Sequence, residues 1–229
     1  MKPPLLILHG AIGASIQLKA VAESLSDYYT IHLPDLPGHG GSALAEEPFS
    51  IQLFATAVRS YIEEHQLQHL TIFGYSMGGY VAMYLAKDYP QFVDRIITLG
   101  TKFHWDEPTA TKEIKMLNPE LIATKVPAFA AVLEALHAPN DWKEILQRTA
   151  DMMEEMGRDN PLKPSDYAAI KTNCLIMLGD RDKMVTFEET LSVYKQLPDA
   201  QMAVLPGTPH IIDQVNPSLI AYLIKNISS

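Results

Sequence analysis

The sequence predicts a doubly wound α/β fold, with a mostly parallel sheet of about six strands and a helical insertion. Short runs rich in Ile, Leu and Val recur along the 229 residues, and stretches with helical spacing separate them. Strands that are apolar at nearly every position are typical of a parallel sheet buried on both faces. Right-handed crossovers between such strands place helices on both sides of the sheet. The length suits one domain with a modest insertion, at about 100–200 residues per domain.

The expected strands and helices alternate along most of the chain. The strands are short apolar runs at residues 5–8, 30–33, 70–73, 96–99, 174–178 and 202–205. The helices have apolar residues at helical spacing and cover residues 15–25, 51–65, 78–87, 187–196 and 214–226. This alternation is the pattern of a parallel α/β sheet.

Residues 102–166 interrupt the alternation. They contain no convincing apolar strand, and helical spacing covers residues 121–136 and 141–156. Their prolines fit the first turns of short helices and the links between them: Pro108, Pro119, Pro127, Pro139, Pro161 and Pro164. Because both flanks return to strands, we expect a core of residues 1–101 and 167–229, with residues 102–166 as a helical insertion.

The charge balance excludes some classes of partner. Eighteen Lys and Arg against 27 Asp and Glu give a net charge of −9. Nucleic acids and anionic lipid surfaces attract cationic proteins, so we expect no nucleic-acid partner and no membrane docking. The balance leaves a small molecule as the expected partner, and the sequence does not predict an oligomeric state.

The single cysteine and the N-terminal residues indicate a reducing compartment. Cys174 lies in an expected strand, where we expect an inert core residue, and no CxxC pair suggests a metal site. Only four apolar residues, 5–8, follow the first prolines. A secretory signal needs about 7–15 apolar residues and a spanning helix about 20. We therefore expect a cytoplasmic protein without a membrane segment.

The sequence Gly74-Tyr75-Ser76-Met77-Gly78-Gly79 follows an expected strand and precedes an expected helix. A serine at so sharp a strand-to-helix turn takes an unfavourable backbone conformation, which exposes its hydroxyl at the sheet edge. Side chains at positions 74 and 78 would collide there, so glycine is a steric requirement. A chance match is the alternative, but the strand–turn–helix context favours Ser76 as a nucleophile.

A serine nucleophile needs a base, and His210 has the best position among the eight histidines. It lies in the loop after the last expected strand, which opens at the same sheet edge as Ser76. A structural loop histidine is the alternative reading. The other histidines fall in a strand run, in surface turns, in the insertion or in glycine-bearing loops.

The expected acid follows the fifth strand. In enzymes with such a serine elbow, the acid comes between the nucleophile and the histidine. Gly179-Asp180-Arg181-Asp182 offers two carboxylates. Asp180 is placed to brace its own loop through backbone N–H groups, while Asp182 lies further out, where it can reach His210. We favour Asp182, then Asp180, with Asp106 third.

Two backbone N–H groups are expected to bind a developing oxyanion. One belongs to Met77, directly after the nucleophile, and the other to Ala11 in the loop after the first strand. Gly10 permits the turn of this loop, and His9 is expected to brace it. A phosphate cradle is the rival reading, but neither GxGxxG nor a GK[ST] ending is present.

The loop at residues 34–42, Pro-Asp-Leu-Pro-Gly-His-Gly-Gly-Ser, follows the second strand. Its prolines and glycines indicate a tightly shaped turn. We expect Asp35 to lock this turn by accepting backbone hydrogen bonds, so the loop forms scaffold at the rim of the site. Catalytic roles for Asp35 or His39 are the minority interpretation.

These motifs together resemble the α/β-hydrolase superfamily. HG at 9–10, DLPGHGGS at 35–42, GYSMGG at 74–79, GDRD at 179–182 and the late His210 fall in family order and span nearly the whole chain. The resemblance implies a Ser–His–Asp triad, a helical cap after the fourth strand, and no cofactor or metal. It also implies that the family's first two antiparallel strands are missing. Ser76 in place of aspartate speaks against the haloalkane dehalogenase and epoxide hydrolase branches.

The loop at 35–42 and the elbow are also similar to the menaquinone-pathway lyase branch of this superfamily. That branch has an arginine after the elbow glycines to hold substrate carboxylates. Here the position is Tyr80, no obvious basic cluster replaces it, and the net charge is unfavourable for an anionic substrate. The lyase, or a C–C bond hydrolase with the same triad, is therefore the alternative function.

The expected function is a serine hydrolase that cleaves a small carboxylic ester or thioester through an acyl-enzyme. Ser76, Asp182 and His210 form the expected triad, and Ala11 and Met77 supply the oxyanion hole. The candidate pocket residues are Ile12, Phe103, His104 and Trp105, with ordinary hinge packing as the alternative for the last three. A non-catalytic ligand-binding protein on a hydrolase scaffold is the third possibility.

Overall fold

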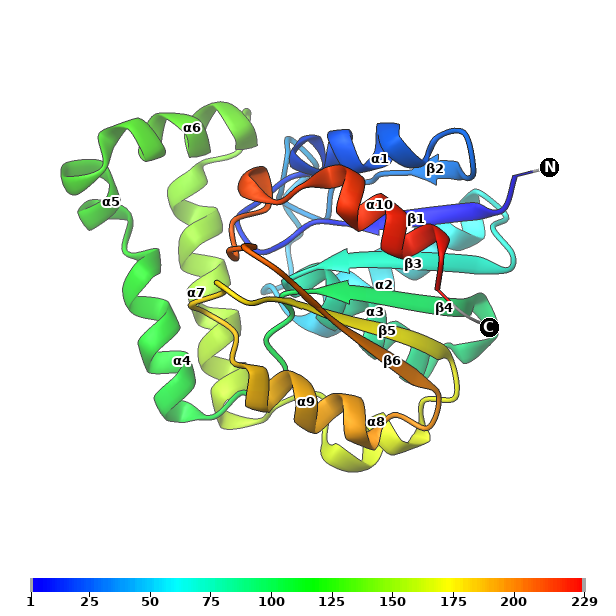
Figure 1. The fold of residues 1–229 in the computed structure, drawn as a ribbon. Helices are drawn as coiled ribbons and strands as arrows, with labels where there is room; N and C mark the ends of the chain where they lie inside the picture. Colours follow the sequence, from blue (N-terminus) through cyan, green and yellow to red (C-terminus); the bar gives the residue numbers. More distant parts are fainter. Residues whose placement is uncertain (1, 228–229) are drawn as a thin grey trace.

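A computed structural model describes residues 2–227 of the chain (Figure 1). One six-stranded sheet has the order β2-β1-β3-β4-β5-β6, and every neighbouring pair is parallel. The strands are β1 (Pro4–Leu8), β2 (Thr30–His32), β3 (Leu70–Tyr75), β4 (Val93–Leu99), β5 (Asn173–Gly179) and β6 (Ala200–Leu205). The predicted fold class is confirmed, and within the described chain the sheet has no antiparallel member.

The helices fill the connections between the strands. The α-helices are α1 (Lys19–Leu25), α2 (Ile51–Glu64), α3 (Met77–Asp88), α4 (Glu107–Ile114), α5 (Pro119–Lys125), α6 (Pro127–His137), α7 (Trp142–Arg158), α8 (Pro164–Ala169), α9 (Phe187–Gln196) and α10 (Pro217–Lys225). Short 3-10 helices are η1 (Ser15–Leu18), η2 (Pro90–Phe92), η3 (Lys115–Leu117) and η4 (Ile212–Gln214). Between Lys2 and Ile227, each helix is too short or too polar to cross a bilayer.

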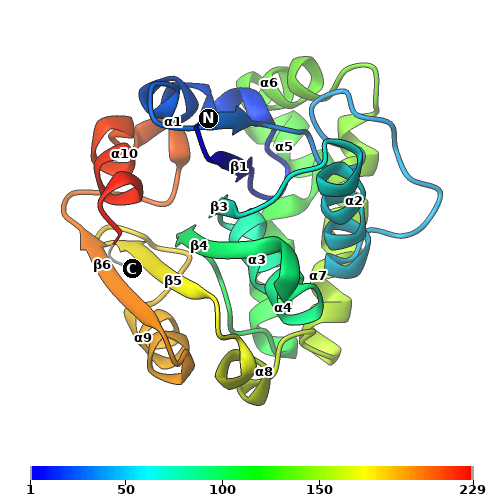
Figure 2. The same ribbon diagram turned by 90° about the vertical axis from the view of Figure 1, so that its right-hand side faces the viewer.

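Both faces of the sheet are buried, as the continuous apolar strands predict. Successive residues of a strand point to opposite faces. Leu5 and Ile7 of β1 pack on the side of α1 and α10, while Leu6 and Leu8 pack on the side of α2 and α3, and all four are fully buried. Figure 2, turned by 90°, shows α1 and α10 on one side of the sheet and α2, α3 and α8 on the other.

The strand order reverses between β1 and β3. The chain passes from β1 to β2 on one side, then crosses to β3 on the other side of β1. The loops after β1 and β3 therefore leave the sheet side by side, at the switch point where open α/β sheets bind ligands. Figure 1 shows α4, α5, α6 and α7 gathered beyond these carboxyl ends of the strands. The switch point and the helices together enclose the site described below.

The segment between β4 and β5 is helical, but one expected helix is wrong. The spacing over residues 121–136 predicts a single helix, whereas α5 ends at Lys125 and α6 begins at Pro127. Val126 has φ −136° and ψ 60°, outside the helical region. A proline disfavours the helical conformation of the residue before it and has no N–H to continue the helix. The apolar period therefore runs across a break that Pro127 imposes.

Candidate active site

Ser76 lies at the turn from β3 into α3 in a conformation that costs free energy. Its φ is 51° and its ψ is −118°. A non-glycine residue with positive φ persists only where surrounding contacts hold it. The N–H of Ser76 donates to the carbonyl of Leu99 at 2.9 Å, and the Thr101 hydroxyl donates to the carbonyl of Ser76 at 3.0 Å. Strand β4 thus holds the elbow from the side.

Glycine is required on both sides of Ser76. A Cβ at Gly74 would lie 2.4 Å from the backbone nitrogen of Gly79. A Cβ at Gly78 would lie 2.4 Å from the carbonyl oxygen of Leu8 at the end of β1. The neighbours are backbone atoms, which cannot rotate away as a side chain can. The first contact closes the elbow, and the second brings the β1 loop against the start of α3.

His210 extends from the loop after β6 and reaches both Ser76 and Asp182. Its Nε2 lies 3.2 Å from Ser76 Oγ, and its Nδ1 lies 2.7 Å from Asp182 Oδ2. The Tyr75 hydroxyl donates to the carbonyl of His210 at 2.8 Å, which fixes the loop next to the elbow. The structure therefore brings together three side chains from the ends of β3, β5 and β6.

Asp182 is held as a carboxylate. Its Oδ1 accepts hydrogen bonds from the backbone of Met184 at 2.8 Å and Val185 at 2.9 Å, while Oδ2 faces His210. Burial alone would raise the pKa of Asp182, but the hydrogen bonds from His210 and from the two backbone N–H groups outweigh it, so the pKa is lowered. A charged Oδ2 favours the His210 proton on Nδ1, which leaves Nε2 as a hydrogen-bond acceptor for the Ser76 hydroxyl.

The two rival acids have other partners. Asp180 Oδ1 accepts a hydrogen bond from the backbone of Thr208 at 3.2 Å, so Asp180 braces the two loops at this edge of the sheet. Asp106 caps α4 by accepting from the backbone of Thr109 at 2.8 Å. Hydrogen bonds from Thr109 and His104 lower the pKa of Asp106 to about 2. Neither of these carboxylates is paired with His210.

Ala11 and Met77 both line the pocket that contains Ser76. The first N–H groups of a helix have no intrahelical acceptor, and Met77 is the first residue of α3. Gly10 lies so close to Tyr75 and Ser76 that a Cβ would be 2.9 Å from the Tyr75 ring and 3.2 Å from Ser76 Cβ. Close approach, rather than the turn itself, makes glycine necessary at position 10.

His9 is a buried bracing residue of the β1 loop. One ring nitrogen, Nδ1, lies 2.8 Å from the carbonyl of Gly10, and Nε2 accepts a hydrogen bond from the backbone of Leu36 at 3.0 Å. Burial lowers the pKa of His9 to about 4. The ring is therefore neutral at pH 7 and links the loop after β1 to the loop after β2.

Asp35 and His39 also have structural partners. Asp35 does not lock its own turn as expected; its Oδ1 accepts a hydrogen bond from the backbone of Ser15 at 2.7 Å and so ties the β1 loop to the β2 loop. Gly40 has no Cβ and lies against the Asp35 carboxylate, where a Cβ would be only 2.3 Å away. His39 is fully buried and stacks on Phe49, with ring centroids 5.4 Å apart. These residues shape the rim and do not reach Ser76.

Comparison with known proteins places this geometry in a family. The model of the α/β-hydrolase fold matches residues 3–164, more than half of the chain. The chain belongs to the α/β-hydrolase fold family. Some relatives of this chain carry the names esterase and lipase.

Individual relatives of this α/β hydrolase vary in their names. This chain is 39% identical over 111 residues to 2-succinyl-6-hydroxy-2,4-cyclohexadiene-1-carboxylate synthase of Enterobacter sp. (strain 638). The aligned region covers 47% of this chain and 41% of the synthase. The chain is 36% identical over 98 residues to an uncharacterized protein of Mycobacterium tuberculosis, which covers 43% of this chain but only 29% of the relative's length. A thermophilic esterase from Thermogutta terrifontis has the same fold, with a TM-score of 0.77, 22% identity and coverage of 98% of this chain and 89% of the esterase.

The pocket beside Ser76 is small and apolar. Its volume is about 40 Å³. Trp105, an expected pocket residue, lines it. Sequence reasoning missed most of the remaining lining: Ile51, Tyr80, Lys102, Met152, Met153 and Met156. The three methionines share one face of α7, since residues three and four apart are neighbours on a helix. Their spacing in the sequence could have predicted this shared face, but it did not show which face of the helix meets the sheet.

Three other expected pocket residues lie elsewhere. Ile12, with φ 50°, packs against the apolar cluster of the helical segment. Phe103 is buried, packs edge-on against Tyr167 at 5.8 Å between ring centroids, and lines a separate groove. His104 is exposed in that same groove, with Nε2 at 3.1 Å from Asp106 Oδ2. Of the candidate pocket residues, only Trp105 lines the pocket at Ser76.

Tyr80 and Lys102 give the pocket its remaining polar groups. The Tyr80 hydroxyl bonds to Asn160 Oδ1 and accepts from the backbone of Leu162 at 2.9 Å, so it anchors the end of the helical segment to α3. Lys102 Nζ lies 3.5 Å from Glu113 Oε1 and 3.7 Å from Glu189 Oε2. Lys102 is therefore neutralised by carboxylates and does not replace the absent arginine.

Residues 2–227 contain no group of three or more His, Cys, Asp or Glu side chains that could hold a metal ion. Cys174 is fully buried in β5, and burial raises the pKa of its thiol to about 12. Ser76, His210 and Asp182 are residue types that serve nucleophilic and acid–base chemistry.

Proposed function

We propose that this protein is a serine hydrolase that cleaves a small carboxylic ester or thioester through an acyl-enzyme. The observation that carries the proposal is the continuous relay from Ser76 Oγ through His210 to Asp182, with contacts of 3.2 Å and 2.7 Å. A nucleophile within hydrogen-bond reach of a base, which is oriented by a third group, is the arrangement that activates a hydroxyl.

The reaction follows from these contacts. His210 Nε2 takes the proton of Ser76 as Oγ attacks the carbonyl carbon of the substrate. The imidazolium then gives this proton to the leaving alkoxide or thiolate, and the acyl group stays on Ser76. Water next attacks the acyl-enzyme with His210 as base, which releases the carboxylic acid. Asp182 keeps the imidazole in the right tautomer and stabilises its positive charge.

The N–H groups of Ala11 and Met77 are the proposed donors to the oxyanion. Both residues border the pocket at Ser76, and the start of α3 adds the positive end of a helix dipole. Removing one such donor typically costs about 3 kcal/mol of transition-state stabilisation. Backbone donors cannot be deleted by mutation, so the side-chain relay is the practical target of a test.

The size of the pocket predicts a short acyl group. The pocket beside Ser76 has a volume of only about 40 Å³, far below the roughly 300–1,000 Å³ typical of small-molecule sites. Met152, Met153 and Met156 form its roof from α7. Methionine is flexible, so the roof adapts to small changes of shape but leaves no room for a long chain.

Labelling with a fluorophosphonate probe tests the nucleophile. We expect wild-type protein to be labelled, Ser76→Ala to be unlabelled, and Ser60→Ala, which changes an exposed serine of α2, to be labelled like wild type. Absence of labelling in correctly folded wild-type protein would contradict the hydrolase proposal and favour the non-catalytic binding protein.

A series of p-nitrophenyl esters tests the acyl group. We expect kcat/KM to be highest for acetate or propionate and to fall with longer chains. Met153→Ala enlarges the pocket, so it is expected to raise kcat/KM for longer esters by roughly fourfold for each methylene group accommodated. A wild-type optimum at eight or more carbons would contradict the proposed pocket.

The lyase or C–C bond hydrolase is the second candidate, favoured by the 39% identity to the Enterobacter synthase. In that case His210 and Ser76 would abstract a proton rather than form an acyl-enzyme. The buried, hydrogen-bonded Tyr80 leaves no free cation at the position of the lyase arginine. Formation of the product that names that synthase, without turnover of any ester, would favour this candidate over the esterase.

A further inference from the structure

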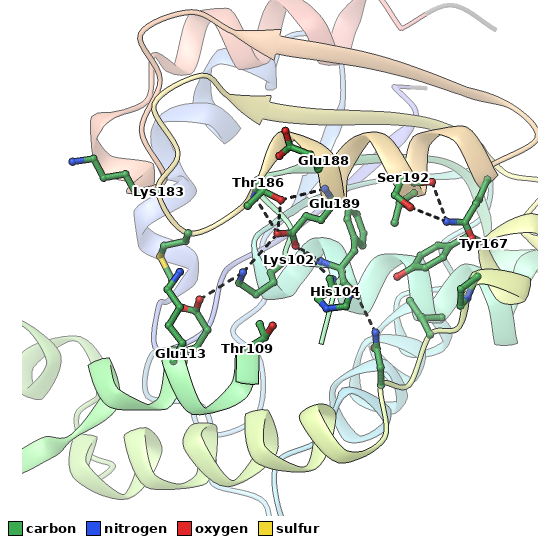
Figure 3. A pocket seen from close by; sticks show the side chains of 18 residues that line it. Lys102, His104, Thr109, Glu113, Tyr167, Lys183, Thr186, Glu188, Glu189 and Ser192 are labelled. Carbon is green, nitrogen blue, oxygen red and sulfur yellow. Dashed lines mark hydrogen bonds and ion pairs between the residues drawn. The ribbon is translucent and has the colours of Figure 1, made fainter. Parts of the chain in front are cut away.

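A groove of about 560 Å³ lies beside the proposed catalytic centre, between α4 and α9 (Figure 3). Its volume lies in the range typical of small-molecule sites, about 300–1,000 Å³. It is lined by residues from the hinge after β4, from α4, from the loop before α8 and α8 itself, and from α9 and the loop before it. Lys102 lines both this groove and the small pocket at Ser76, so it is the wall that the two spaces share.

Three buried charges form one end of the groove. Lys102 lies between Glu113 of α4 and Glu189 of α9, and their side chains are 13%, 3% and 10% exposed. Lys102 is flanked by two carboxylates here, and Lys112, Lys183 and Glu188 also line the groove. Desolvating a carboxylate is costly unless hydrogen bonds or a cation compensate it. The compensation differs sharply between the two glutamates.

Glu189 is fully engaged, whereas Glu113 is not. Glu189 Oε1 accepts from the backbone of Phe103 at 3.2 Å, and Oε2 accepts from the backbone of Thr186 at 3.0 Å. Neither oxygen of Glu113 accepts a hydrogen bond from the described residues; its contact is the ion pair with Lys102 at 3.5 Å. Figure 3 shows Glu113 on α4, extending toward Lys102 inside the groove.

The other end of the groove carries two further unpaired polar groups. Tyr167 is 3% exposed, and its hydroxyl has no hydrogen-bond partner among residues 2–227. Figure 3 shows this hydroxyl pointing into the groove. Gln196 donates to the carbonyl of Ser192 at 3.0 Å, but its Oε1 is buried without a partner within the described chain. Buried polar groups are normally paired, so their concentration in one groove indicates a ligand that supplies the partners.

We propose that the groove between α4 and α9 binds the leaving half of the substrate, and that Glu113 selects a leaving group with a primary ammonium group. An ammonium group supplies the donors that the two Glu113 oxygens lack. The Tyr167 hydroxyl and Gln196 Oε1 then bind polar groups farther along the same ligand. This proposal rests on the proposed function, because the groove borders, across Lys102, the pocket proposed for the acyl group.

A matched pair of acetate esters tests the selection. At neutral pH, 4-aminobutyl acetate carries an ammonium group where pentyl acetate has a methyl group. We expect wild-type protein to prefer the ammonium ester by about tenfold in kcat/KM, as one charge-assisted hydrogen bond provides. Glu113→Gln keeps the shape but removes the charge, so the ratio of the two rates is expected to fall close to one. Glu107→Gln, an exposed change on the same helix, is expected to keep the wild-type ratio.

Calorimetric titration with 4-amino-1-butanol, the free leaving group, separates this proposal from the proposed function. We expect wild-type protein to bind it and Glu113→Gln to bind it about tenfold more weakly. Hydrolysis of p-nitrophenyl acetate without any preference between the paired esters would overturn the subsite and leave the hydrolase intact. Binding that depends on Glu113, without any ester hydrolysis, would retain the subsite and overturn the hydrolase. A wild-type preference unchanged in Glu113→Gln would also overturn the assignment.

Discussion

The loops at the carboxyl ends of the strands and the helical segment α4–α7 are held in place by different forces. In the loops, backbone atoms meet at distances that exclude any side chain, as at Gly78 against Leu8. The helical segment is held mainly through side chains: apolar residues of α7 join the core cluster, and polar side chains reach the loops. His137 Nε2 donates to the carbonyl of Ile12 at 3.0 Å, and Asn140 Nδ2 donates to the carbonyls of Gly38 at 3.2 Å and Ser42 at 2.7 Å.

Because the two regions are held differently, the positions of the three site residues and the shape of the pocket depend on different contacts. The positions of Ser76, Asp182 and His210 depend on the close-packed backbone of the sheet edge. The shape of the pocket at Ser76 depends on the methionines of α7, a helix held by apolar side-chain packing and by a few hydrogen bonds. We expect changes at the sheet edge to abolish the reaction or the fold, and changes in the segment to alter stability and substrate range by smaller amounts.

The largest effect is expected from Asp182→Asn. An amide at this position cannot stabilise the imidazolium and favours the wrong tautomer of His210, so kcat is expected to fall by about 10⁴. Asp180→Asn, two residues away, removes a carboxylate that contacts only loop groups and is expected to retain most activity. Steady-state kinetics with p-nitrophenyl acetate measures both variants. Equal losses would mean that the two carboxylates were assigned wrongly.

The next largest effect concerns the backbone contacts. Gly78→Ala forces a Cβ to within 2.4 Å of the Leu8 carbonyl oxygen, and we expect a loss of roughly 4 kcal/mol in the free energy of unfolding. Gly207→Ala is the control, because nothing lies within 4 Å of its Cβ, although its φ of +64° costs about 1 kcal/mol. Urea denaturation followed by circular dichroism gives both values. A Gly78→Ala variant as stable as Gly207→Ala would show that the elbow can relax.

Acid is expected to destabilise the loops through buried histidines. Burial lowers the pKa of His9 from 6.5 to about 4. Between these values the unfolded chain binds the proton and the native protein does not, so the free energy of unfolding decreases as the pH falls. For His9 alone the decrease is about 3 kcal/mol between pH 6.5 and pH 4. His39, whose pKa burial also lowers, adds to it.

Urea denaturation at several pH values measures this slope, and histidine NMR resonances assign it. We expect the His9 resonance to remain that of a neutral ring down to about pH 4. A native His9 that titrates near pH 6.5 would refute the explanation.

The smallest effect is expected in the contact of the helical segment with the loops. Asn140→Ala removes two hydrogen bonds to backbone carbonyls, and we expect a loss of about 1–2 kcal/mol together with faster proteolysis near the segment. Gln147→Ala is the control, since its exposed side chain bonds only to Asp151 on the same helix. If Asn140→Ala lowered stability as much as Gly78→Ala, the proposed contrast between the two regions would be wrong.

Much of the fold was predictable because its determinants are local. The continuous apolar runs predict the six strands, and the glycines around Ser76 predict the elbow. Helix α9 covers the same residues as expected, 187–196, because Thr186 and Glu189 form a capping box at its start. The break at Pro127 is also local, yet an apolar period that continues across it concealed the end of α5.

The site was less predictable where contacts join distant parts of the chain. Trp105 was expected in the pocket, but Lys102 was not, because its position depends on Glu113 and Glu189 from two other helices. Asp35 was expected to stabilise its own turn, whereas its partner is Ser15 in another loop. Nothing in the sequence around a carboxylate tells whether it accepts hydrogen bonds from its own loop or from a distant part of the chain.

By itself, the sequence determined the parallel sheet and the order of nucleophile, acid and histidine along it, since apolar runs and required glycines act within a few residues. Only the tertiary structure decided that Asp182 rather than Asp180 faces His210, at 2.7 Å, and that α7 closes the pocket over Ser76. The reason is geometric. Two carboxylates two residues apart in a loop, or different faces of one helix, fit the same sequence pattern, yet their side chains lie several ångströms apart.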